Sequence, residues 1–162
     1  MAKVEHSVEM NVPVSTAYNQ WTQFESFPQF MEGVEQVQQM GDKRLHWRAK
    51  IGGQEREWDA EITEQSPDER VAWTSTSGTR NAGVVTFHYL EPGRCKVMLQ
   101  MEFEPEGLTE SMGTAMGVVT GRVKGDLDRF KEFIEARQTE TGAWRGEIKR
   151  DDVRGQPGGV IG

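Results

Sequence analysis

Two side chains with the chemistry of a general acid or base fall where the sequence predicts buried strand faces. His6 shares the phase of Val4 and Val8 in an alternating N-terminal stretch, which predicts an imidazole on the apolar face of a strand. A buried imidazole can act as a general base that enolises a carbonyl compound, with Tyr89 or Ser75 polarising the carbonyl oxygen. The alternative is a structural histidine that is simply hydrogen-bonded. His6 and Tyr89 are therefore the candidate catalytic residues.

The other histidines and the single cysteine form no metal-binding pattern. The three histidines are isolated, Cys95 is the only cysteine, and the glutamates fall on the polar faces of the expected strands. The sequence also contains no Ser-His-Asp arrangement, P-loop or dinucleotide fingerprint. We therefore expect no metal and no cofactor. A lone cysteine forms no internal disulfide and favours a cytoplasmic protein.

Bulky apolar side chains dominate the expected inner faces of the strands and of a C-terminal helix. Tryptophan offers a broad flat face and methionine an adaptable thioether, and both suit an apolar ligand. By itself, such a set either closes up as a filled core or leaves a pocket. The candidate ligand-binding residues are Trp47, Trp58, Trp73, Phe87, Tyr89, Leu99, Met101, Met112, Met116, Val119 and Val123.

These residues are positioned by a sequence that alternates with a period of two over most of its first two thirds. The first predicted strand ends at Pro13, and strands then follow one another from about Val34 to Phe103. Short turns separate them, such as Gly52-Gly53 and Pro92-Gly93. Short turns between consecutive strands are typical of an antiparallel meander.

Helical spacing occurs in two regions. Ser15 can cap a short helix, and a second short, broken piece follows around Pro28. After Pro105 the apolar residues recur every three or four positions to about Arg137, with Thr109 as a plausible N-cap. The sequence therefore predicts two short helices after the first strand and one long helix after the last.

The end of the sequence lacks this periodicity. Residues 139–162 are rich in glycine and charge, so we expect one domain of residues 1–138 followed by a flexible polar tail. Trp144, in the stretch GAWRGEI, is the one sizeable anchor in that tail. Arginine beside tryptophan in a polar segment suits a docking peptide, which leaves open a protein-interaction module.

The charge balance narrows the class of partner. The 162-residue chain has a formal net charge of −7 and no basic cluster, so nucleic acid is not expected as a partner. No segment approaches the roughly 18 apolar residues of a membrane span. We expect neither a nucleic-acid-binding protein nor a membrane-spanning one.

Glycine recurs every fourth residue in the first half of the long helix, at Gly113, Gly117, Gly121 and Gly125. Each interior glycine costs a helix about 1 kcal/mol relative to alanine. At about 100° per residue, these glycines fall on the flank and back of the helix, away from the sheet. They indicate either a smooth face for a second subunit, hence a possible homodimer, or a soft segment that opens as a lid.

The order of elements is that of the helix-grip fold, an α+β fold. In it a curved seven-stranded antiparallel sheet wraps around a long C-terminal helix, with two short helices between strands 1 and 2. The stretches VSTAYNQWTQFESFPQFMEGVEQV (14–37) and 46–97 resemble the polyketide cyclase/dehydrase group of the START-like (SRPBCC) superfamily, which is related to coenzyme-Q-binding proteins. The resemblance covers about residues 2–138.

This resemblance implies a pocket, rather than a filled core, between the sheet and the long helix. The leading hypothesis is a protein that binds or transports a hydrophobic small molecule such as a lipid, an isoprenoid quinone or a polyketide-like compound. One alternative is a polyketide aromatase/cyclase that acts on a carbonyl-rich substrate in the same cavity. Another is an interaction module that uses the C-terminal tail, and whether the protein is an enzyme stays open.

Overall fold

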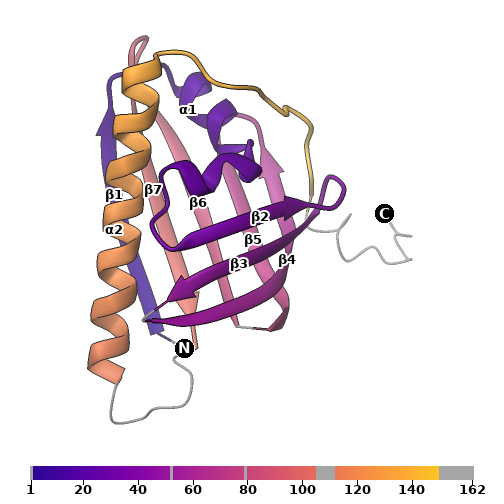
Figure 1. Cartoon of the computed structure of the whole chain (residues 1–162). Coiled ribbons are helices and arrows are strands. Elements are labelled where there is room, and N and C mark those ends of the chain that lie inside the picture. The colour runs from indigo at the N-terminus through magenta and orange to yellow at the C-terminus, as the bar shows by residue number, and fades with distance from the viewer. Residues whose placement is uncertain (1, 52, 79, 105–111, 150–162) are drawn as a thin grey trace.

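The structure is a computed structural model that describes residues 2–51, 53–78, 80–104 and 112–149 (Figure 1). Its central feature is a seven-stranded antiparallel sheet in the order β1-β7-β6-β5-β4-β3-β2. The strands are β1 (Ala2–Met10), β2 (Val34–Gln39), β3 (Arg44–Ile51), β4 (Gln54–Ser66), β5 (Arg70–Gly78), β6 (Asn81–Glu91) and β7 (Arg94–Phe103). The predicted seven-stranded antiparallel sheet is confirmed.

Three helices accompany the sheet in the described part of the chain. Two short ones, α1 (Val14–Trp21) and the 3₁₀-helix η1 (Phe24–Gln29), lie between β1 and β2, as predicted. The long helix α2 (Met112–Arg137) follows β7, whereas its expected cap, Thr109, lies outside the described residues. No helix among the described residues is long and apolar enough to cross a bilayer.

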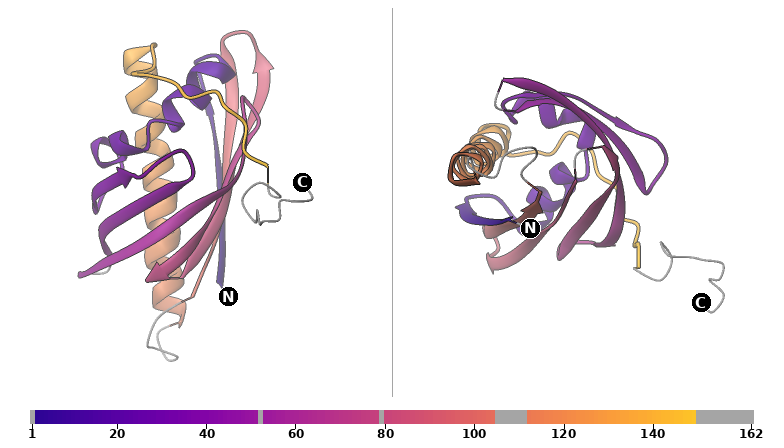
Figure 2. Two further views of the ribbon diagram at one scale, coloured as in Figure 1. Left: turned by 90° about the vertical axis from the view of Figure 1, so that its right-hand side faces the viewer. Right: turned by 90° about the horizontal axis from the view of Figure 1, so that it is seen from below.

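The sheet curls into a half-barrel, and α2 runs along its open side (Figure 2). Register shifts in the β4–β5 pair, next to Ala60 and Glu64, add to the twist of the sheet. The helix contacts the protein at both edges of the sheet. His6 of edge strand β1 faces Asp128, and Glu32, just before edge strand β2, donates its backbone N–H to Asp126. The helix thus closes the gap between the two edge strands.

The core lies inside this half-barrel. In β4 the buried residues Trp58, Ala60 and Ile62 alternate with more exposed ones, as expected of a strand with one wet face. On α2 the buried residues recur every three or four positions and form one apolar stripe. That stripe consists of Val123, Leu127, Phe130 and Ile134.

Residues 139–149 differ from the flexible tail expected from the sequence. They run from the end of α2 across α1 to the sheet (Figure 1). The backbone N–H of Trp144 donates to Thr22 Oγ1 at 3.0 Å, and Ile148 exchanges two backbone hydrogen bonds with Gln65 at 2.8 and 2.9 Å. Ile148 is only 3 % exposed. Apolar and backbone contacts thus hold this polar segment, whereas residues 150–162 lie outside the described residues.

Candidate functional site

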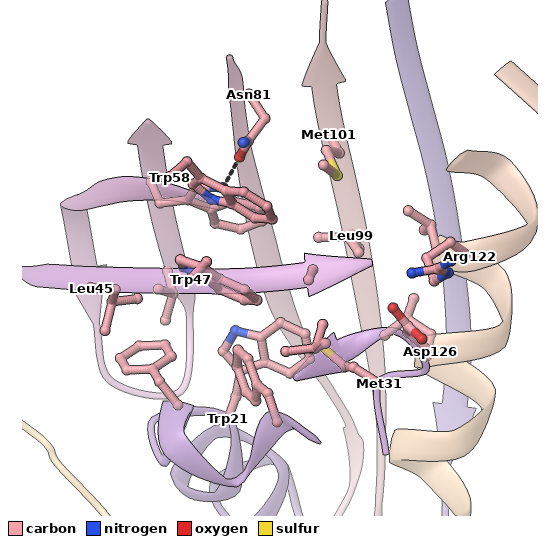
Figure 3. Close-up of a pocket in the computed structure, with 18 of the residues that line it drawn as sticks. Trp21, Met31, Leu45, Trp47, Trp58, Asn81, Leu99, Met101, Arg122 and Asp126 are labelled. Atoms are coloured by element: carbon pink, nitrogen blue, oxygen red, sulfur yellow. Dashed lines mark hydrogen bonds between the residues drawn. The ribbon is translucent and has the colours of Figure 1, made fainter. Parts of the chain in front are cut away.

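A cavity of about 140 Å³ lies between the concave face of the sheet and α2 (Figure 3). Aromatic rings from α1, η1 and three strands form much of its wall. These rings belong to Trp21, Phe24, Phe27, Trp47, Trp58 and Trp73. Helix α2 supplies the opposite wall, with Val119, Val123 and Leu127 among its residues. The cavity is therefore mainly apolar.

The structure brings most of the expected ligand-binding residues to this cavity. Alternation put the strand residues among them on one face of the sheet, and the curl of the sheet turns that face toward α2. The expected residues that line the cavity are Trp47, Trp58, Trp73, Leu99, Met101, Val119 and Val123. The side chains of Met112 and Met116 lie outside the described residues.

Two expected residues of β6 do not reach the cavity. Phe87 is buried in the core, where its ring meets that of Tyr18 edge-on at 5.3 Å between centroids. Tyr89 is 63 % exposed and does not line the cavity, so its prediction as a ligand-binding and catalytic residue was wrong. It lies near the β6–β7 turn, beside a register shift between Tyr89 and Glu91, beyond the part of the strand that packs inward. Alternation shows which face of a strand a residue lies on, but not that the end of β6 extends beyond the core.

His6 is half-buried between β1 and α2, and it does not line the cavity. Its Nε2 lies 3.7 Å from Asp128 Oδ1, and this nitrogen is buried without a hydrogen-bond partner among the described residues. Ser75 accepts a hydrogen bond from the backbone N–H of Asn81 at 3.0 Å. The catalytic constellation expected from His6, Tyr89 and Ser75 is therefore not assembled at the cavity.

The aromatic wall is fixed by ring-to-ring contacts. Trp47 and Trp58 stack with their centroids 5.6 Å apart, and the ring centroid of Phe27 also lies 5.6 Å from that of Trp47. The Trp21 ring in turn lies 5.0 Å from that of Phe27. The sequence predicted a short helical piece around Pro28, but not that its aromatic residues line the same cavity as the strand tryptophans.

Gly83 makes room for the third strand tryptophan. A Cβ at this glycine would lie 2.6 Å from Cζ2 of Trp73, so the indole ring covers the bare backbone of β6. Its Nε1 donates a hydrogen bond to Asn81 Oδ1 at 3.1 Å. The ring is thus held by packing on one side and by a hydrogen bond at its polar edge.

A charged group of three α2 residues lies at one end of the cavity. Arg122 and Asp126, one turn apart, both line it, and Figure 3 shows them on the cavity side of the helix. Asp126 Oδ1 accepts hydrogen bonds from Arg129 Nη2 at 2.6 Å and from the backbone N–H of Glu32 at 3.1 Å. Arg122 Nη1 donates to the backbone oxygens of Glu32 at 2.8 Å and Lys50 at 3.2 Å.

The apolar patterns of the sequence did not point to this polar end. The spacing along the helix could have revealed it. Arg122 lies three positions after Val119, and Asp126 three positions after Val123, so each charged residue shares a helix face with an apolar cavity residue. Burial raises the pKa of Asp126 to about 6, although Arg129 acts in the opposite direction. This carboxyl group therefore changes charge close to neutral pH.

Gly33 permits the close approach of Arg122 to the chain before β2. Its φ is +84°, and an added Cβ would clash with Arg122 Nη1 and lie 2.7 Å from the backbone oxygen of Lys50. Only glycine meets both conditions without strain. Among the described residues no cluster of histidine, cysteine, aspartate or glutamate could hold a metal ion.

Comparisons with known proteins agree with this geometry. Residues 10–132 match the family model described as polyketide cyclase / dehydrase and lipid transport. A protein of Streptomyces lincolnensis, described as an uncharacterized 17.2 kDa protein in the melC2-rnhH intergenic region, is 58 % identical over 149 residues. That alignment covers 91 % of this chain and 99 % of the relative.

Solved structures with low sequence identity share the fold. The Zhui aromatase/cyclase from Streptomyces sp. R1128 superposes with a TM-score of 0.74 at 14 % identity, covering 88 % of this chain and 99 % of that one. TTHA0849 from Thermus thermophilus superposes with a TM-score of 0.73 at 20 % identity, and the alignment covers 84 % of this chain and 99 % of that one. A START superfamily protein from Mycobacterium smegmatis superposes with a TM-score of 0.67 at 15 % identity, and the alignment covers 82 % of this chain and 98 % of that one. The resemblance expected from the sequence is confirmed.

Proposed function

Because the chain belongs to the polyketide cyclase/dehydrase and lipid transport family, we propose that it binds and carries a hydrophobic small molecule in the cavity between the sheet and α2. The observation that carries this proposal is the aromatic wall around an interior space. Rings that filled a core would leave no such space, and flat rings with thioethers accept apolar ligands of varied shape.

The size of the cavity limits what it holds without rearrangement. Its 140 Å³ is close to the roughly 150 Å³ of engineered protein cavities that bind benzene, and below the roughly 300 Å³ at which pockets for drug-sized ligands begin. One aromatic ring, or the end of a longer chain, therefore fits. A larger ligand requires side chains of the wall to move, and Met31 and Met101 are the most adaptable of them.

A polyketide aromatase/cyclase is the second candidate function. The charged end of the cavity favours it, because catalysis on a carbonyl compound needs ionisable groups beside the ligand. The fold shared with the Zhui aromatase/cyclase is compatible with this chemistry. We rank carriage first because His6 and Tyr89, the candidates for such chemistry, lie outside the cavity.

Three features outside the cavity bear on partners and location: the GAWRGEI stretch, the glycines of α2 and the single cysteine. The stretch GAWRGEI packs on its own domain, which weakens the case for an interaction module that uses it. A homodimer through the glycine face of α2 stays a prediction, with open space around the Cβ positions of Gly117 and Gly121 as its support. A cytoplasmic location likewise stays a prediction, based on the single cysteine, Cys95.

Extraction of the gently purified protein with organic solvent, followed by mass spectrometry, tests carriage directly. We expect an apolar compound in the wild-type protein and in Tyr89→Ala, whose changed side chain lies outside the cavity. We expect little of it in Val123→Phe, which adds a ring at the cavity wall. Recovery of the same compound from Val123→Phe, at wild-type amounts, would place its binding site elsewhere.

A further inference from the structure

We infer that the cavity selects ligands that carry a neutral hydrogen-bond donor at one end, such as a phenol or enol hydroxyl, and that Asp126 receives this donor. The inference rests on the proposed function and adds the chemistry of the ligand's polar end. It makes Asp126 a residue that determines specificity.

The two oxygens of Asp126 have different surroundings. The side chain is only 13 % exposed, and Oδ1 already accepts two hydrogen bonds, from Arg129 and from the backbone of Glu32. No donor among the described residues reaches Oδ2. A carboxylate has acceptor capacity on both oxygens, and Asp126 lines the cavity. Oδ2 is therefore the acceptor available to a ligand.

Two neighbouring polar residues of the cavity wall, Arg122 and Asn81, are hydrogen-bonded to the protein. Arg122 Nη1 donates to two backbone oxygens, and Asn81 Oδ1 accepts from Trp73. The indole nitrogen of Trp47 has no hydrogen-bond partner among the described residues, but it is fully buried and can only donate. Of these groups, Asp126 alone combines an unused acceptor with a position on the cavity wall.

Charge around Asp126 favours a neutral donor over a charged one. Arg122 and Arg129 on the same helix already offset the negative charge of Asp126, so a ligand ammonium gains little there, and a ligand carboxylate has no proton to donate to Oδ2. Glu32, the charged residue of the segment packed against them, is 73 % exposed at its side chain and lies 3.7 Å from Arg129. A hydroxyl supplies a donor without bringing a charge out of water, and it forms a charge-assisted hydrogen bond in apolar surroundings.

Three single-ring probes separate ring binding from donor recognition. Toluene has no polar group, p-cresol adds a hydroxyl, and acetophenone offers only an acceptor. At pH 7.5 we expect p-cresol to bind about tenfold more tightly than toluene in calorimetric titrations, as a net hydrogen bond to a charged group implies. Acetophenone should gain no comparable advantage. Equal affinities of p-cresol and toluene would overturn this inference alone, whereas no binding of any probe would overturn the proposed function as well.

Asp126→Asn makes the test sharper. Arg129 and the Glu32 backbone are both donors, so they retain the amide oxygen and leave the amide NH₂ in the place of Oδ2. The preference for p-cresol over toluene should then fall to about twofold or less, and acetophenone should become the better ligand. Asp128→Asn is the matched control, because it removes the same charge from the same helix at a side chain that is 52 % exposed and outside the cavity. An unchanged preference in Asp126→Asn would contradict the inference.

The wild-type protein allows the same test without a substitution. At pH 5 Asp126 is mainly protonated, since its pKa is about 6. The proton belongs on Oδ2 because Oδ1 faces two donors, so the group then donates into the cavity. Between pH 7.5 and pH 5 the affinity for acetophenone should rise relative to that for p-cresol. A ratio that does not change with pH would argue against Asp126 as the contact.

Discussion

Trp47 and Trp58 lie opposite each other in the β3–β4 pair and stack with ring planes 9° apart and centroids 5.6 Å apart. Both rings line the cavity, so a single cross-strand pair supplies a continuous flat wall. Cross-strand aromatic pairs stabilise a sheet in addition to the area they bury. This pair therefore links the stability of the half-barrel to the shape of the binding space.

Trp58→Ala should enlarge the cavity and destabilise the fold. Truncation of a buried tryptophan costs about 3 to 5 kcal/mol of unfolding free energy, because the contacts are lost and a void remains. Urea denaturation measures this loss, and binding of naphthalene relative to toluene should increase. Tyr89→Ala, at an exposed ring outside the cavity, should change the unfolding free energy by about 0.5 kcal/mol or less. Equal costs for the two variants would show that the stacked pair contributes no special stability.

Asp126 should make stability depend on pH between about 4 and 6. Burial raises its pKa from 3.8 to about 6, so in this window the native protein holds a proton that the unfolded chain has released. The free energy of unfolding therefore falls as the pH rises through the window and levels off above it, by at most about 3 kcal/mol in total.

The difference in unfolding free energy between the wild type and Asp126→Asn, measured from pH 4 to pH 7, isolates this effect from the other carboxyl groups. The wild type should lose stability relative to the variant as the pH rises. The difference between the wild type and Asp128→Asn should show no such trend, because both proteins keep the Asp126 carboxyl group. A flat difference for Asp126→Asn would mean that the carboxyl titrates alike in the folded and unfolded states.

Gly33→Ala should displace Arg122 from the backbone oxygens that it binds. Gly53→Ala is a matched control, because Gly53 has the same φ of +84° but nothing within 4 Å of its Cβ position. Both variants are expected to lose about 1 kcal/mol to backbone strain. Gly33→Ala should lose about 1 to 2 kcal/mol more, through the steric clash and the lost hydrogen bonds. Thermal denaturation compares the two, and similar losses would indicate that Arg122 moves aside without cost.

Residues 139–149 should stabilise the domain. Arg145 donates to Asn19 Oδ1 at 2.6 Å, lies 2.9 Å from Asp68 Oδ2 and covers the ring of Tyr18. Truncation after Gln138 should lower the unfolding free energy by about 2 to 4 kcal/mol relative to truncation after Lys149, mainly through the lost burial of Ile148 and Trp144. Equal stabilities would mean that the segment lies on the domain without holding it.

Much of the fold followed from local patterns. Period-two alternation assigned Trp47, Trp58 and Leu99 to inner faces, because successive side chains of a strand point to opposite sides whatever the strand pairs with. The same rule misassigned Tyr89, since alternation does not report where a strand extends past the core. Helical spacing located the long helix equally well, because its buried stripe recurs every three or four residues.

The sequence by itself determined the order of elements, the inner faces and the family, since each depends on short-range periodicity or on recognisable stretches of residues. Only the tertiary structure decided which residues meet around the cavity. Asp126 and Glu32 come together because α2 closes the gap between the two edge strands, and nothing local to either residue encodes that contact. Burial at that junction then gives Asp126 its raised pKa, because removal from water destabilises the charged carboxylate.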